Sequence, residues 1–217
     1  MPVVNVNGKL LGRITIDDVV DVIAEIAEEE RQLMSGISED VEEDDSIWML
    51  TRARLPWLIV GVVGGLLSSL LMDSFEADLS RSLAIAFFVP LIMATGGNVG
   101  IQSSSIVVQT LANPSVFTDG IFKRLIKVLV VAILNGMVLA GLVMLVMMFM
   151  ITDSNLGFVV GAALFCVVLV ASFMGTITPI VLDRFGINPA LASGPFITTT
   201  NDILGLAIYF MIVHFLM

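Results

Sequence analysis

Five stretches of this 217-residue chain are long and apolar enough to cross a lipid bilayer. A helix of about 20 mostly apolar residues spans the ~30 Å hydrocarbon core of a membrane. The stretches run from Leu55 to Met72, from Leu83 to Leu111, from about Leu125 to Met150, from Leu156 to Leu182, and from Leu191 to about Phe215. This pattern predicts an all-α membrane protein with five transmembrane helices.

The composition agrees with a membrane body that carries an acidic head. Only 14% of the residues are charged, against about 25% in a typical soluble domain. Residues 1–54 hold 13 of the 20 acids and 5 of the 10 bases, so their net charge is −8 and that of the remaining residues is −2. A single Cys and a single His exclude a disulfide framework and a zinc or Fe–S cluster within one chain. The acidic balance argues against nucleic acid as a partner.

The N-terminal residues resemble neither a signal peptide nor a complete domain. They lack an unbroken apolar run behind a basic segment, so we expect the N-terminus to stay in the cytosol. Pro2 to Gly12 predicts two short strands joined by a type I′ turn at Asn7-Gly8, and Thr15 is placed to cap a following helix. A hairpin and one helix cannot bury a core of their own. We therefore expect a hairpin–helix remnant of a cytosolic domain.

The distribution of Lys and Arg predicts the orientation of the spans. With the N-terminus inside, five crossings put the C-terminus outside, as a multi-pass protein of the cell (inner or plasma) membrane. Arg81 is then the only base on an outer flank, whereas the inner flanks carry Arg52, Arg54, Lys123, Arg124, Lys127 and Arg184.

The second span carries a polar stripe. Its members recur at steps of three and four residues, which places them on one helix face: Thr95, Asn98, Gln102, Ser105 and Gln109. We expect Pro90, Gly96, Gly97 and Gly100 to interrupt this helix, and open backbone is tolerated at membrane depth only where it is buried or lines a water-filled cavity. Packing between helices is an alternative explanation of the stripe.

The fifth span repeats the pattern around the only acid inside any span. Asp202 lies about 16 Å along the helix from Leu191, near mid-membrane. A carboxylate there costs about 2.5 to 3.5 kcal/mol on insertion scales, so it should face water, a cation or a partner. The alternative is a protonated carboxyl bonded to Asn98 or Thr198. Two polar stripes with Gly and Pro at similar depth favour a shared aqueous path.

The expected lining of this path consists of hard oxygen ligands, which soft metals do not prefer. Ca²⁺ takes six to eight oxygens, whereas Mg²⁺ keeps several waters and needs only one or two carboxylates. One carboxylate per chain therefore favours a partly hydrated Mg²⁺, and the ligand types also admit Mn²⁺ or Co²⁺. A two-fold homodimer is the simplest way to bring two Asp202 side chains to one axis.

Three segments resemble a known family. Residues 87–112, FFVPLIMATGGNVGIQSSSIVVQTLA, and residues 187–210, INPALASGPFITTTNDILGLAIYF, resemble the second and fifth membrane helices of the MgtE family of magnesium channels. The segment PVVNVNGKLLGRITIDDVVDVI resembles the end of the second CBS domain of that family. The resemblance implies three parts: the end of a CBS-like domain (1–22), an acidic plug or connecting helix (23–54), and a five-helix pore domain (55–217).

The resemblance also implies a homodimer with a pore on its two-fold axis. We expect the ion at Asp202, Thr198 and Asn98. The expected pore lining is Thr95, Gly96, Gly97, Gln102, Ser105, Leu191, Gly194, Pro195, Asn201 and Gly205. Acids that match regulatory Mg²⁺ positions of the family are Asp18, Asp21, Glu28, Glu29 and Glu30.

The function expected from these observations is a Mg²⁺-selective ion channel for magnesium uptake, not an enzyme. The expected partners are a second copy of the chain, membrane lipid and divalent cations. A divalent cation exchanger coupled to Na⁺ or H⁺ is the main alternative. A membrane scaffold that transports nothing is a third hypothesis.

Overall fold

The computed structural model describes residues 1–112, 121–150 and 154–217. Within these residues, five helical segments are long and apolar enough to cross a membrane, which confirms the prediction of an all-α membrane protein with five spans. The spans are α2 (Ile47–Ser74), η1 with α4 (Leu83–Phe88 and Val89–Leu111), α5 (Ile121–Met150), α6 (Ser154–Arg184), and η3 with α7 (Pro189–Ala192 and Pro195–Leu216). The first span is longer than predicted, because its helix begins at Ile47 rather than Leu55.

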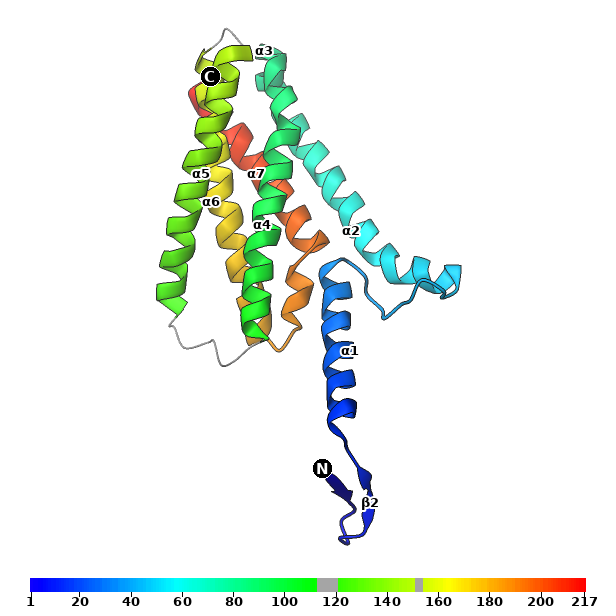
Figure 1. Cartoon of the computed structure of the whole chain (residues 1–217). Coiled ribbons are helices and arrows are strands. Elements are labelled where there is room, and N and C mark those ends of the chain that lie inside the picture. Colours follow the sequence, from blue (N-terminus) through cyan, green and yellow to red (C-terminus); the bar gives the residue numbers. More distant parts are fainter. Residues whose placement is uncertain (113–120, 151–153) are drawn as a thin grey trace.

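The spans form a bundle centred on α6, which packs against α4, α5 and α7 (Figure 1). The apolar core of the bundle includes the fully buried Val160, Val167 and Leu206. By contrast, α2 contacts α7 and leans away from α4, so most of its surface is exposed (Figure 1). The short helix α3 (Glu76–Arg81) marks one end of the bundle, called the α3 end. The opposite end is called the α1 end.

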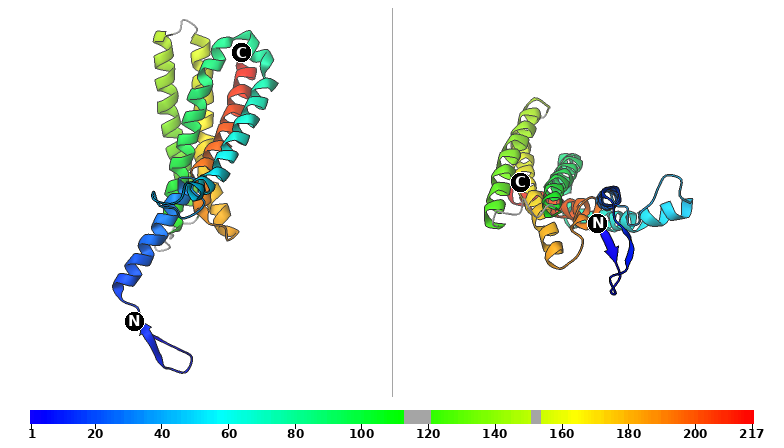
Figure 2. Two further views of the ribbon diagram at one scale, coloured as in Figure 1. Left: turned by 90° about the vertical axis from the view of Figure 1, so that its right-hand side faces the viewer. Right: turned by 60° about the horizontal axis from the view of Figure 1, so that its bottom comes forward.

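The N-terminal hairpin and helix α1 (Ile16–Met34) extend beyond the α1 end of the bundle (Figure 2). Thr15 caps α1 as predicted: its hydroxyl accepts from the Asp18 N–H, while the Asp18 carboxylate accepts from the Thr15 N–H at 2.7 Å. Strands β1 (Pro2–Val4) and β2 (Leu10–Arg13) pair antiparallel.

The prediction of a type I′ turn at Asn7-Gly8 is wrong. Such a turn needs positive φ at both central residues, but only Gly8 has one, at 77°. The connection is longer, because Asn5 and Lys9 bond to each other across the loop and the Asn5 side chain accepts the N–H groups of Asn7 and Lys9. The asparagine side chain thus reinforces a backbone turn over residues 5–8, in which the Gly8 N–H donates to the Asn5 carbonyl at 2.9 Å.

The prediction that glycine and proline residues interrupt the helix of the second span is also wrong. Pro90 lies in the first turn of α4, where a missing N–H is tolerated. Gly96, Gly97 and Gly100 lie within continuous helix and are buried. These glycines are contact points: a Cβ on Gly100 would overlap the Asn201 side chain of α7, and one on Gly175 of α6 would overlap the Gly100 carbonyl oxygen. The fifth span is interrupted as predicted, at Gly194, whose φ is 55°.

The α3 end of the bundle is held by polar and aromatic contacts to α7. The Tyr209 hydroxyl donates to the Ile85 carbonyl at 2.8 Å, and the Phe210 ring stacks on Phe75 with centroids 5.1 Å apart. Asp78, which is buried, lies 3.0 Å from Nδ1 of His214. These contacts fix the C-terminal half of α7 against η1, α2 and α3.

The contact at Gly100 predicts the effect of adding one methyl group. Gly100→Ala should destabilise the bundle by about 1 to 3 kcal/mol, because the new Cβ overlaps Asn201 and forces α4 and α7 apart. Gly141→Ala in α5 is the matched control, because its Cβ would meet nothing within 4 Å. Thermal unfolding in detergent measures both, and equal midpoints for the two variants would contradict this account.

The Tyr209 bond predicts a second stability effect. Tyr209→Phe removes a buried hydroxyl and leaves the Ile85 carbonyl without its donor, which should cost about 1 kcal/mol. Ser69→Ala is the control, because the Ser69 hydroxyl is exposed and bonds only to Gly65 one turn earlier. The same unfolding assay should show a lower midpoint for Tyr209→Phe alone.

Candidate functional site

The site is built where α7 crosses α4. Thr198 and Asp202 are four residues apart, so they share one face of α7. This face approaches α4 at Gly97, where a Cβ would lie 3.2 Å from Thr198 Cγ2 and 3.6 Å from Asp202 Oδ1. Because Gly97 has no side chain, the carboxylate can lie directly against the α4 backbone.

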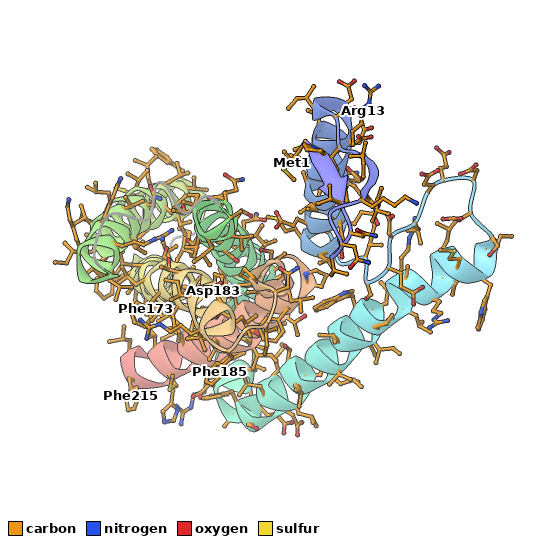
Figure 3. All side chains as sticks on the ribbon, turned by 90° about the horizontal axis from the view of Figure 1, so that it is seen from below. Met1, Arg13, Phe173, Asp183, Phe185 and Phe215 are labelled. Carbon is orange, nitrogen blue, oxygen red and sulfur yellow. The ribbon has the colours of Figure 1, made fainter. Side chains whose placement is uncertain are left out.

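Asp202 opens into a groove of about 740 Å³ between α2, α4 and α7, called here the Asp202 groove. On α7 it is lined by Pro195, Thr198, Thr199 and Asp202. On the other helices its wall includes Met93 and Ile101 of α4 and Trp57, Gly61, Gly64, Gly65 and Ser68 of α2. Seen from the α1 end, α2 lies beside the bundle, and α1 lies nearer to the viewer than α2 (Figure 3).

Asp202 is half-buried, and no base in the described part of the chain forms an ion pair with it. The nearby Thr198 hydroxyl donates to the Gly194 carbonyl at 2.9 Å, so its oxygen keeps its capacity as an acceptor. Arg54 is the one base in the groove wall among the described residues. The arrangement therefore offers oxygen ligands and one formal negative charge to a cation.

The backbone break before α7 is fixed by hydrogen bonds to α4. The buried Ser104 hydroxyl lies 2.8 Å from the Ala192 carbonyl oxygen and 3.1 Å from the Ser193 hydroxyl. Gly194 follows with a left-handed φ of 55°, which glycine adopts without strain. These contacts set the point at which α7 begins and hence the depth of Asp202.

The α1 end of the groove is covered by the segment that follows α1. Gly36 has a φ of 80°, and a Cβ there would lie 2.9 Å from Cδ of Pro195. A Cβ on Gly194 would overlap the Met34 carbonyl oxygen. The segment around Gly36 therefore packs against the start of α7, and neither Gly36 nor Gly194 has room for a side chain.

The polar stripe of α4 lies outside this groove. Thr95 and Ser105 are half-exposed, and Asn98, Gln102 and Gln109 are exposed. Asn98 follows Gly97, so it lies about 100° further round the helix axis and does not line the Asp202 groove. The structure thus brings Thr198 and Asp202 together and leaves Asn98 on the free face of α4.

Several expected pore-lining residues are buried in helix packing instead. A Cβ on Gly96 would lie 3.1 Å from Val167 Cγ1, and one on Gly205 would lie 3.3 Å from the same atom. Asn201 is only 2% exposed, and its amide atoms have no hydrogen-bond partner among the described residues. Leu191 is half-buried in η3, whereas Gly194 and Pro195 do line the groove.

The expected regulatory acids lie along α1. Thr15 hydrogen bonds, chiefly from its backbone N–H, lower the pKa of Asp18. A hydrogen bond from Arg31 lowers the pKa of Glu28. Asp21 and Glu29 are exposed, and Glu30 is half-exposed. Within residues 1–112, 121–150 and 154–217, no group of three or more His, Cys, Asp or Glu side chains is arranged to hold a metal ion.

Helix α2 contributes a wall of the groove that was not predicted from the sequence. Gly61, Gly64, Gly65 and Ser68 line the groove, and a Cβ on Gly64 would overlap the Thr199 side chain. The spacing of these small residues at three and four positions is the signal of a close helix contact in a membrane. The apolar composition of the first span hides this signal.

Comparison with known proteins places the chain in a family. Residues 89–212 match the MgtE family model, which is described as a divalent cation transporter. The magnesium transporter MgtE of Bacillus subtilis is 36% identical over 97% of this chain and 47% of its own length. The proteins of the same name from Enterococcus faecalis and Thermus thermophilus are 34% and 32% identical over the whole chain and 48% of their own lengths.

This chain spans about half the length of the curated relatives it matches. The matched region contains α4, α5 and α6 and most of α7, including the whole crossing that holds Asp202. Members of the family are divalent cation transporters, not enzymes. The chain belongs to the MgtE family of divalent cation transporters.

Proposed function

We propose that this chain forms the pore of a Mg²⁺-selective channel for magnesium uptake. The observation that carries the proposal is Asp202, a carboxylate at membrane depth that lines a groove and forms no ion pair with a base among the described residues. The curated relatives are named magnesium transporters, which supports Mg²⁺ as the ion. The ion is cargo, held for a short time and then released.

The donors around Asp202 suit a partly hydrated Mg²⁺. One carboxylate and the Thr198 hydroxyl cannot complete six ligands, so water would fill most positions, as Mg²⁺ prefers. Ca²⁺ would need more protein oxygens than the groove offers. The same ligands admit Mn²⁺ or Co²⁺, so selectivity among these three ions would depend on how much hydration water the groove retains.

The exposed stripe of α4 supports a homodimer. Asn98, Gln102 and Gln109 carry amides that would face lipid in a single chain, which is unfavourable in the hydrocarbon core. A second copy would cover this face and bring two α4 stripes and two α7 helices to a two-fold axis. Two Asp202 carboxylates facing one axis repel each other unless a divalent cation lies between them.

The flanking bases support a cytosolic N-terminus. Lys123, Arg124 and Arg184 lie near the α1 end of the bundle, whereas Arg81 lies at the α3 end. Bases concentrate on the cytosolic side of membrane proteins. An interior negative potential then drives a cation inward with about 2.3 kcal/mol per charge per 100 mV, and a divalent ion gains twice that.

We propose that residues 1–54 lie in the cytosol and act as a gate. Residues 1–22 would be the end of a CBS-like domain and residues 23–54 the plug segment, although the division between them falls inside α1. Residues 34–37 close the α1 end of the Asp202 groove in this conformation. Mg²⁺ binding at Asp18, Asp21, Glu28, Glu29 and Glu30 would stabilise that closed arrangement.

Substitution of Asp202 tests the proposal. Asp202→Asn should reduce Mg²⁺ influx into proteoliposomes by about tenfold or more, because it removes the charge that holds the ion. Asp183→Asn is the matched control. Asp183 is exposed near the C-terminal end of α6 and lies outside the groove (Figure 3). Full influx in Asp202→Asn would overturn the proposed site.

The same vesicles distinguish a channel from a coupled exchanger. The reversal potential of a channel follows the Mg²⁺ gradient alone, whereas that of an exchanger shifts when Na⁺ or H⁺ is changed. Competition by Ca²⁺, Mn²⁺ and Co²⁺ measures selectivity. Absence of any flux or metal binding in the unmodified chain would favour a scaffold.

A further inference from the structure

Ser68 of α2 carries a buried hydroxyl without a partner. The residue is only 6% exposed, and its hydroxyl oxygen has no hydrogen-bond partner among the described residues. The other hydroxyl side chains of α2 donate to the carbonyl one turn earlier: Thr51 to Ile47, Ser69 to Gly65 and Ser74 to Leu70. A buried polar group that makes no bond costs free energy. Such a group in a folded protein calls for a partner that arrives from outside the chain.

The position of Ser68 connects it with the Asp202 groove, which both residues line. Helices α2 and α7 both run from the α1 end to the α3 end of the bundle (Figure 1). They touch where a Cβ on Gly64 would overlap the Thr199 side chain. From this contact Ser68 lies about 6 Å further along α2, and Asp202 lies about 4.5 Å further along α7. Ser68 and Asp202 therefore face the groove at nearly the same depth.

A second unpartnered group of the groove does not share this position. Nε1 of Trp57 also lacks a hydrogen-bond partner among the described residues. Trp57 lies about 16 Å nearer the α1 end than Ser68 along the same helix. An indole N–H can only donate, whereas a serine hydroxyl can also accept. Of the two groups, Ser68 is the acceptor at the depth of Asp202.

A hydration water of a cation would supply the missing bond. Mg²⁺ keeps several of its waters when it binds to a protein, and these waters direct their O–H groups outward to acceptors. Thr198 is already prepared for such a contact, because its hydroxyl donates to the Gly194 carbonyl and keeps its capacity to accept. Rotation about χ1 would let the Ser68 hydroxyl donate to the Gly64 carbonyl in the same way and accept from water in the groove.

We propose that Ser68 accepts a hydrogen bond from a hydration water of the Mg²⁺ ion held at Asp202. Ser68 is then a positioning residue, because it touches the water of the ion and not the ion itself. The inference rests on the proposed ion site at Asp202 and adds α2 to that site.

Thermal unfolding in detergent with EDTA tests whether the hydroxyl lacks a partner in the metal-free chain. Ser68→Ala should unfold at the same midpoint as the unmodified chain or at a higher one, because it removes a buried polar group that bonds to nothing. Ser69→Ala is the matched control, because the exposed Ser69 hydroxyl bonds to Gly65 and lies outside the groove. A lower midpoint for Ser68→Ala than for Ser69→Ala would identify a packing role and overturn the proposal.

The Mg²⁺ dependence of influx into proteoliposomes tests the contact with the ion. The Mg²⁺ concentration for half-maximal influx should rise about fivefold in Ser68→Ala, the effect of losing one hydrogen bond. It should stay unchanged in Ser69→Ala. Equal values for Ser68→Ala and the unmodified chain would contradict the proposed contact.

The double variant with Asp202→Asn separates this inference from the proposed function. If both side chains act on one ion, Ser68→Ala should cause no further loss of influx in the Asp202→Asn background. A further fivefold loss there would mean that Ser68 acts elsewhere and would overturn the inference. Loss of influx in Asp202→Asn with a normal Ser68→Ala would overturn the inference alone, whereas full influx in Asp202→Asn would overturn the ion site as well.

Discussion

The close approach of α4 and α7 determines how the residues around their crossing are arranged. Gly97 and Gly100 allow Thr198, Asn201 and Asp202 to lie directly against the α4 backbone. In a membrane the hydrophobic effect does not drive helices together, so close van der Waals contact between small residues must do so. The position of Asp202, the burial of Asn201 and the direction of the groove all follow from this contact.

The sequence predicted features that depend on local chemistry and missed those that depend on tertiary contacts. Hydropathy located the five spans, because lipid selects composition along each helix. The cost of an acid at membrane depth identified Asp202, which does line a groove. By contrast, Gly100 was interpreted as a helix break, because the pattern cannot tell a glycine that opens the backbone from one that admits a neighbour. For the same reason the groove wall on α2 was missed, and Asn201, which was expected in the pore lining, is buried between helices instead.

Helix α4 separates opposite electrostatic environments. One side faces the Asp202 groove, and another faces a second cavity of about 620 Å³, whose lining includes Lys123, Arg124 and Lys127. The helix carries no charge of its own between Val89 and Leu111. A half-buried carboxylate and a cluster of bases can therefore exist within one small bundle, because an uncharged helix and its packed glycines keep them apart.

Buried contacts hold the C-terminal half of α7 on more sides than its N-terminal half, where one face opens into the Asp202 groove. From Gly205 to Val213 its buried side chains are locked by Tyr209, Phe210 and their partners, whereas the residues from Thr198 to Thr200 are only half-buried. Local motion is greatest where few buried contacts oppose it. Asp202 lies at the junction, so its carboxylate has a firm support on one side and freedom on the other. At the ion site proposed here, this graded stiffness would let an ion enter, pause and leave, since a fully rigid cage would hold it too long.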